Sequence, residues 1–423
     1  MRRGPGRIKA SLVLWAGAVG IGCAATALAA AAGGAFAWFE AMRGRWWWWP
    51  FCVLPVGGMA LTWFIHRVGP GTEGSGIQQA VAALQVAGEG QLPGRLINLR
   101  LALAKFIAIV GGMASGFVLG LEGPTVQIGA SILFSLRRFF PRDTAMLRRQ
   151  LIRAGGAAGI AAAFNAPLAG LVFAFEEMSH APGHASGKLV AAIVLAGVVA
   201  QPVFGYQSYF GRLALSGDLP LASLQALALL AFAGGLVGGG LSWMALRTQH
   251  WIPQRVQRLR LTHPYAFVVV CGLLIALLGM AAPIFGSGAE TTRALLAGRA
   301  DLPWYYLPCK FSGLLLTMLT GLPGGVFSPS LSLGAGLGAW FLPFAGEAWQ
   351  AECIAVGMTA VLAAVTRAPL TAAFIMIEMT DGHTLVLEML GAAFIAAHVA
   401  RLYGVRFYHE QAVRIVSARY KKV

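Results

Sequence analysis

The sequence predicts an all-helical, polytopic membrane protein made of two related halves of tilted and broken helices, and two observations predict this fold class. Hydrophobic residues make up 57% of the 423 residues and charged residues 11%, whereas a soluble domain carries roughly 25% charged residues. So few charges cannot cover a water-facing surface, and most of the chain is therefore expected to lie in lipid. The second observation is an internal repeat, carried by two pairs of motifs.

Apolar segments recur along the whole chain. The first, at 10–39, is far longer than the roughly 7–15-residue core of a signal peptide, so it predicts a long tilted span. The tryptophans at 46–49 follow where an interfacial aromatic belt is expected. Several later segments are too short to cross about 30 Å of hydrocarbon, or are broken by Gly and Pro, which is typical of a site built from helix ends. The full set of apolar segments after the first is 50–66, 98–119, 125–135, 154–177, 188–206, 221–246, 264–285, 304–322, 326–345, 352–365, 368–379 and 384–402.

The repeat relates the two parts of the chain. GLEGPTVQIGA at 120–130 matches GVFSPSLSLGA, which begins 205 positions later at 325. AAAFNAPLAGLVFAFE at 161–176 matches AAVTRAPLTAAFIMIE, which begins 202 positions later at 363. Repeats of this kind in transporters are often inverted. We therefore expect one transmembrane transport domain, 1–423, with its first half at 1–206 and its second at 207–423.

Basic residues give a net charge of +16 and cluster in short stretches at 2–9, 137–153, 247–260 and 401–422. Clusters between apolar segments follow the positive-inside pattern, so the expected partner is membrane lipid and not nucleic acid, with both termini cytoplasmic. The five cysteines form no CxxC and the eight histidines no HExxH. No metal and no cofactor is therefore expected.

Three glycine-rich motifs are candidates for an anion site. Gly120–Pro124 ends one apolar segment and starts another, and Gly324–Pro329 repeats this arrangement in the second half. Gly74–Ile77 (GSGI) is the third, with a hydroxyl at Ser75. At such helix starts the free N–H groups and the positive end of the dipole favour an anion, and they do so without the full charge that would hold it too long.

Glu122 is the most informative single residue, because an ionisable group inside the membrane is costly and marks function. Charged, it could occupy the anion site, and protonated it could leave, so it could act as both gate and proton carrier. The alternative is a helix N-terminal cap. An alternative from a different class of protein is an intramembrane enzyme in which Glu122 acts as the acid or base. No nucleophile–base pair or metal motif supports that reading, so the protein is not expected to be an enzyme.

Two further pairs of charged residues stand out. Glu176 and Glu177 end an apolar run, either as a solvated helix end or as functional acids. Lys105 and Lys310 lie within apolar segments, where they could pair with acids or raise the potential for an anion.

At these motifs the sequence resembles the CLC family of chloride channels and chloride–proton antiporters, of the prokaryotic type without cytoplasmic nucleotide-binding domains. GLEGP resembles the family's GxEGP signature, GGVFSP its GGxFxP signature and GSGI its first filter motif, and the resemblance covers roughly residues 10–415. It implies a homodimer with one pore per subunit, each subunit made of two inverted halves, in the bacterial inner (plasma) membrane.

The resemblance also implies roles for individual residues. Glu122 matches the gating glutamate and Glu177 the internal proton-transfer glutamate of antiporters. The GVRFYHEQA segment resembles the one that bears the pore tyrosine. The residues implied in anion binding are Ser75, Gly76, Ile77, Gly123, Val326, Phe327 and Tyr408.

Three departures from the family pattern accompany the match. Gln78 stands where the filter motif usually has Pro, and Leu121 where Arg usually precedes the gating glutamate. The chain ends at Val423, which leaves no room for paired nucleotide-binding domains. The implied function is chloride–proton antiport, and the alternative is an uncoupled chloride-selective channel. Glu177 separates the two, because a channel needs no internal acid.

Overall fold

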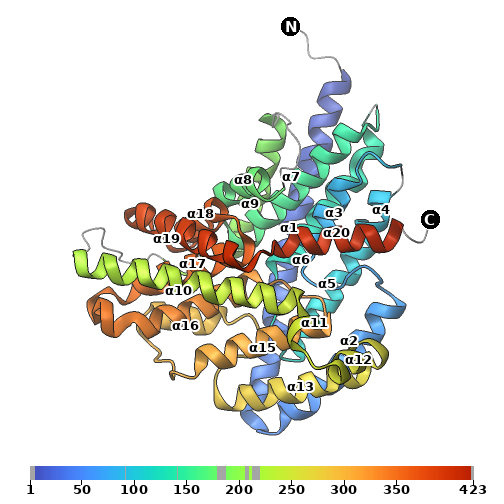
Figure 1. The fold of residues 1–423 in the computed structure, drawn as a ribbon. Coiled ribbons are helices and arrows are strands. Elements are labelled where there is room, and N and C mark those ends of the chain that lie inside the picture. The colour runs from blue at the N-terminus through green and yellow to red at the C-terminus, as the bar shows by residue number, and fades with distance from the viewer. Residues whose placement is uncertain are drawn as a thin grey trace.

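The chain is built of helices, as the sequence predicts. A computed structural model describes residues 5–90, 92–140, 142–178, 187–204, 209–211 and 220–420, and these residues contain no β-strand (Figure 1). Six helical segments in this part of the chain are long and apolar enough to cross a membrane. They are Ser11–Arg45, Trp49–Arg67, Leu92–Ala114, Leu221–Leu246, Pro264–Ala281 and His383–Tyr403.

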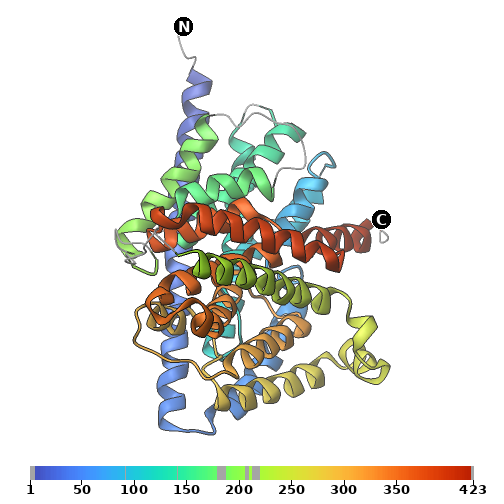
Figure 2. The same cartoon turned by 60° about the vertical axis from the view of Figure 1, so that its left-hand side comes forward.

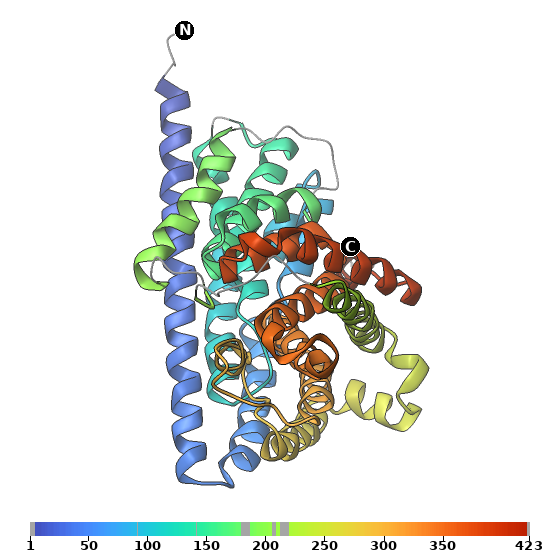
Figure 3. The ribbon, with the colours of Figure 1, turned by 90° about the vertical axis from the view of Figure 1, so that its left-hand side faces the viewer.

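The helices are strongly tilted against one another. Helix α1 (Pro5–Arg45) runs the height of the molecule, whereas α10 (Leu221–Leu246) crosses it at a steep angle (Figures 1 and 2). In Figure 3 the upright α1 stands at one side of the molecule, and α10 is seen nearly end-on at the other side. The first helix is therefore long, as the apolar run at 10–39 predicts, and it extends beyond that run at both ends.

The remaining helices follow the order of the predicted apolar segments. Those of the first half are α2 (Trp49–Arg67), α3 (Ile77–Gln85), α4 (Leu92–Leu96), α5 (Leu99–Ala114), α6 (Glu122–Ser135), α7 (Ala145–Phe164), α8 (Pro167–Glu176) and α9 (Gly187–Phe204). Those that follow α10 are α11 (Thr248–Trp251), α12 (Gln254–Thr262), α13 (Pro264–Ala281), α14 (Ala289–Leu296), α15 (Tyr306–Thr320), α16 (Phe327–Ala345), α17 (Gln350–Thr366), α18 (Pro369–Thr380), α19 (Val386–Val399) and α20 (Phe407–Tyr420). The predicted boundary between the halves, at 206 and 207, lies outside the described residues.

The sequence repeat corresponds to a repeat of structure. Helix α7 is followed by Asn165 and α17 by Arg367, C-terminal caps that are both left-handed (φ 52° and 58°), and the next helix in each case starts with Pro. Helix α6 packs along α7 as α16 packs along α17. Glycine permits the second contact, because a Cβ atom on Gly334 would lie 2.6 Å from the Cα of Met358.

Helices α8 and α18 cap each other across the two halves. The Glu176 carboxylate, at the end of α8, accepts the N–H groups of Leu370 (3.0 Å) and Thr371 (2.6 Å), in the first turn of α18. The Glu378 carboxylate, near the end of α18, accepts those of Leu168 (3.1 Å) and Ala169 (2.7 Å), in the first turn of α8. Because the end of each helix meets the start of the other, the two helices run antiparallel, as inverted halves require.

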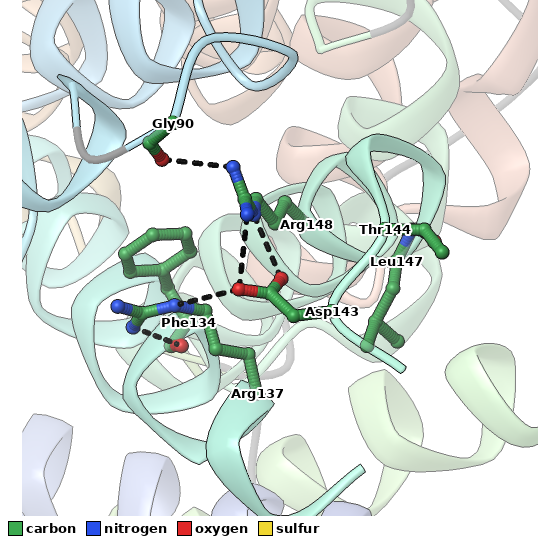
Figure 4. A network of polar contacts seen from close by, with 7 residues as sticks. All are labelled: Gly90, Phe134, Arg137, Asp143, Thr144, Leu147 and Arg148. Atoms are coloured by element: carbon green, nitrogen blue, oxygen red, sulfur yellow. Dashed lines mark hydrogen bonds and ion pairs between the residues drawn. The ribbon is translucent and has the colours of Figure 1, made fainter. Parts of the chain in front are cut away.

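The basic stretch at 137–153 is partly ordered by one acid. The Asp143 carboxylate accepts two hydrogen bonds from Arg148 (2.7 and 3.0 Å) and lies 3.6 Å from Arg137 (Figure 4). Arg148 also donates to the Gly90 carbonyl (2.8 Å), and Thr144 caps the start of α7. These two arginines therefore hold the turn between α6 and α7.

Candidate functional site

The three glycine-rich motifs meet in the interior and are joined through their backbones. Gly120 and Gly325 exchange two N–H···O bonds of 2.8 Å, which link the motifs related by the repeat. Gly74 donates to the Gly321 carbonyl (3.3 Å) and accepts from the Gly324 amide (3.0 Å), which adds the third motif. The short loops therefore hold the starts of α3, α6 and α16 close together.

The backbones at this junction approach too closely for side chains. Gly76 has φ 112°, and a Cβ atom there would lie 2.6 Å from the Gly123 carbonyl oxygen. Ile77 and Glu122 begin the helices that follow, and Phe327 begins α16. Three helix N-termini, whose first N–H groups have no partner within their own helices, therefore supply positive potential in one buried place.

The Glu122 carboxylate lies at the start of α16, in the other half of the chain. Its side chain is 3% exposed. It accepts a hydrogen bond from the Ser328 backbone N–H (3.3 Å) and a short one from the Ser328 hydroxyl. The carboxylate thus caps the N-terminus of α16, as the helix-cap alternative allows, whereas no side chain caps its own helix α6.

Two buried hydroxyls face the same region. Ser75 and Tyr408 are 3% and 1% exposed, and neither hydroxyl has a partner with hydrogen-bond geometry among the described residues. The two nevertheless lie close enough for their side chains to interact. The Tyr408 ring is 6.1 Å from that of Phe327, the first residue of α16. Buried hydroxyls are normally paired, so this pair is suited to a ligand that accepts hydrogen bonds.

Two larger cavities and one of about 40 Å³, which is lined by Ser75 and Val326 among others, reach the site, and the two larger ones share no lining residue. The first, of about 480 Å³, we call the Glu122 cavity; it is lined by Glu122 and Leu121, by the ion pair Glu40–Arg43, and by Glu290 and Arg293. The second, of about 340 Å³, we call the Tyr408 cavity; its charged and polar lining comes from α8, α17, α20 and nearby turns. That lining includes Tyr408, His409, Glu176, Glu177, Arg367, Arg401 and Arg406.

The adjacent acids Glu176 and Glu177 have different surroundings. Glu176 ends α8 partly exposed on the Tyr408 cavity, and its carboxylate also caps α18. Glu177 follows α8 and lines the Tyr408 cavity. The structure thus places Glu177 on the same cavity as the orphan hydroxyl of Tyr408.

The two buried lysines hold loops and do not bind carboxylates. Lys105 donates to the carbonyls of Thr72 (2.7 Å) and Gly74 (2.6 Å), just before Ser75. Lys310 donates to the carbonyls of Ile284 (2.8 Å) and Gly286 (3.2 Å). In these four hydrogen bonds the ammonium groups of Lys105 and Lys310 donate to carbonyl oxygens, and not to acids as one of the two expectations had it.

The two departures from the family motifs change local contacts. The Gln78 side-chain oxygen accepts the Gly76 N–H (3.2 Å), so that amide, one of the expected anion donors, has a partner within the protein. Leu121 is half-buried on the Glu122 cavity, where an arginine would have brought a positive charge.

Sequence reasoning missed several residues of the site. Ser328 stands inside the GGVFSP motif, and its hydroxyl next to a helix start was the available signal. Arg367 stands in the second copy of the repeat and Arg406 in the segment of Tyr408, but these two and Arg401 meet only in the folded chain. A third repeat pair was also readable, because GSG recurs at 286–288 ahead of α14.

Comparisons with known proteins show the family and the fold of the chain. The model of the voltage gated chloride channel family matches residues 57–401. A slow cyanobacterial Cl⁻/H⁺ antiporter has a similar structure, with a TM-score of 0.82, 26% identity, and coverage of 98% of this chain and 99% of that one. A CLC-type fluoride/proton antiporter (0.78, 22%, 95% and 98%) and a eukaryotic CLC transporter (0.77, 23%, 96% and 74%) share the fold.

Proposed function

The chain belongs to the voltage-gated chloride channel family, and from this membership we propose that it exchanges chloride for protons. Members of the family are integral membrane proteins that transport anions. Membership therefore indicates that this chain transports anions rather than catalysing a reaction. The observation that carries the finer proposal is the buried Glu122 carboxylate, which occupies a helix N-terminus beside two unpaired buried hydroxyls.

The proposed anion site lies between the two cavities. The hydroxyls of Ser75 and Tyr408 donate to the anion from the side of the Tyr408 cavity. The amides at the starts of α3, α6 and α16 surround it, which assigns Ile77, Gly123, Val326 and Phe327 as backbone donors. Gly76 contributes through the tight turn that brings Ser75 against Gly123. Neutral donors of this kind bind an anion without preventing its release.

Glu122 is the proposed gate. In the state observed, its carboxylate takes donors at the start of α16 that an anion could use instead. A negative carboxylate and an anion compete for these donors, whereas a protonated side chain gives them up more easily. Each cycle of the gate therefore exchanges a proton for an anion.

Glu177 is the proposed second proton site. It lines the Tyr408 cavity, so protons and anions can enter from the same space. The arginines of that cavity attract anions. An acid at this position supports the antiporter over the uncoupled channel, because an uncoupled channel has no use for it.

The surroundings of the protein are proposed on the same basis. The basic clusters near both ends of the chain support cytoplasmic termini, and the resemblance to the prokaryotic type of the family supports the bacterial inner membrane as the location. Family membership supports a homodimer with one pore per subunit.

The test is proton uptake driven by a chloride gradient into liposomes that contain the purified protein. We expect chloride efflux to acidify the lumen of the vesicles and a protonophore to abolish the pH change. Chloride flux without any proton movement would replace this proposal with the uncoupled channel.

A further inference from the structure

We propose that the Ser328 hydroxyl is a latch for the Glu122 gate, and that it passes its hydrogen bond from the carboxylate to the incoming anion when the gate opens. This inference rests on the proposed gating role of Glu122 and assigns a second residue to it. Among the described contacts of Glu122, those to Ser328 are the ones that cross from the other half of the chain.

Ser328 holds both oxygens of the carboxylate. It is the second residue of α16 and is 5% exposed. Its N–H donates to Oε2 of Glu122 (3.3 Å) and its hydroxyl to Oε1. Hydrogen bonds to an ionised acceptor are roughly twice as strong as neutral ones, so this residue stabilises the charged, closed gate.

The Ser328 latch binds a carboxylate, that of Glu122, for which no ion pair is found among the described residues. Leu121 precedes the gate in place of an arginine, and the ion pairs found in the described part of the chain do not include Glu122. Neutral donors therefore hold the buried carboxylate, and the Ser328 hydroxyl is the one that a side chain supplies.

The same hydroxyl is placed to meet the anion. Ser328 directly follows Val326 and Phe327, whose amides are proposed anion donors. When Glu122 is protonated and leaves, the Ser328 hydroxyl remains buried, and an unpaired buried donor is unfavourable. Rotation toward an arriving anion restores the bond, so carboxylate and anion share one donor in turn.

The experiment compares Ser328→Val with Ser328→Thr, two β-branched side chains of the same shape that differ in the hydroxyl. Chloride flux is measured in liposomes across pH. A donor to the charged carboxylate favours its ionised form, so without the donor Glu122 is protonated at higher pH. We expect Ser328→Val to move the half-maximal pH of flux upward by about one unit, and Ser328→Thr to leave it near the original value.

Ser330→Ala is the matched control. Ser330 is a buried serine on the same helix whose hydroxyl has no hydrogen-bond partner among the described residues. Its loss should not shift the half-maximal pH. Each variant is checked for a monodisperse size-exclusion peak, and Ser328→Ala replaces the valine variant if that one aggregates.

A Glu122→Gln background separates this inference from the proposed function. There the flux should be independent of pH, and adding Ser328→Val should lower chloride affinity about tenfold by calorimetry. A half-maximal pH unchanged by Ser328→Val, with Glu122→Gln itself independent of pH, overturns the latch alone. An unchanged affinity overturns the transfer to the anion. If Glu122→Gln keeps its pH dependence, the gate and the latch are both wrong.

Discussion

Ser75 and Tyr408 bury two hydroxyl groups that have no hydrogen-bond partner among the described residues. Removing one donor to a bound anion costs about 1.5–3 kcal/mol. We therefore predict that Tyr408→Phe, which removes only the hydroxyl, weakens chloride binding about ten- to a hundredfold in isothermal titration calorimetry. Tyr306→Phe is the control, because the Tyr306 hydroxyl pairs with Ser332 instead (2.6 Å). Equal affinity in Tyr408→Phe and the unmodified protein would remove Tyr408 from the anion site.

Glu177 and Glu176 are neighbours with different partners, which makes them a matched pair for a test of coupling. We predict that Glu177→Gln keeps chloride flux and loses chloride-driven proton movement in liposomes. Glu176→Gln should keep both, because the Glu176 carboxylate caps α18 and takes no part in the proposed proton route. Coupled transport that survives in Glu177→Gln would leave the second proton site to another residue.

At this scale the sequence predicted residues that stand inside motifs and missed those that only the fold brings together. Glu122 and Ser75 could be found because glycine and proline mark the helix starts beside them. Ser328 was missed because its importance depends on a carboxylate 206 residues earlier in the chain. The arginines of the Tyr408 cavity belong to different segments, and no local pattern connects them.

At the scale of helices, the mutual capping of α8 and α18 gives a prediction about stability. Glu378→Gln replaces a charged acceptor of two amides with a neutral one. We expect it to lower the free energy of unfolding by about 1–2 kcal/mol, seen as a lower temperature of half-loss of the monodisperse peak in detergent. Glu89→Gln is the control, because Glu89 is exposed. Equal thermal stability in both variants would contradict the capping role.

Helices with long apolar runs were predicted well, and their ends were not. The run at 50–66 corresponds closely to α2 (Trp49–Arg67), because a proline stands in its first turn and His66 and Arg67 in its last. Helix α14 was missed because it mixes polar and apolar residues and falls between two apolar runs. The run at 154–177 contains parts of two helices, α7 and α8, because Asn165 adopts a left-handed turn that hydrophobicity does not reveal.

For the whole molecule, coupling is expected to depend on the gate. We predict that Glu122→Gln gives chloride flux that is independent of pH and moves no protons, since the side chain can no longer exchange a proton. Parallel recordings of chloride and pH on the same liposomes measure this. Proton pumping against a gradient in Glu122→Gln would refute the gating role.

The repeat made the overall fold predictable, but its orientation required the structure. Two matched motifs at offsets of 205 and 202 positions indicate duplication, yet they say nothing about direction. The antiparallel capping of α8 and α18 supplies the direction. The assignment of the half boundary to 206 and 207 remains a prediction.

The mutual capping also has a consequence for how the protein is made. The N–H group of Leu168 donates to the carboxylate of Glu378, which lies 210 residues later in the chain. When α8 has been synthesised and α18 has not, the first-turn N–H groups of α8 therefore have no acceptor from the protein. They lack one until α18 is inserted. The first half therefore cannot complete these hydrogen bonds by itself. During synthesis, lipid headgroups, water or insertion factors must satisfy the N–H groups at the start of α8.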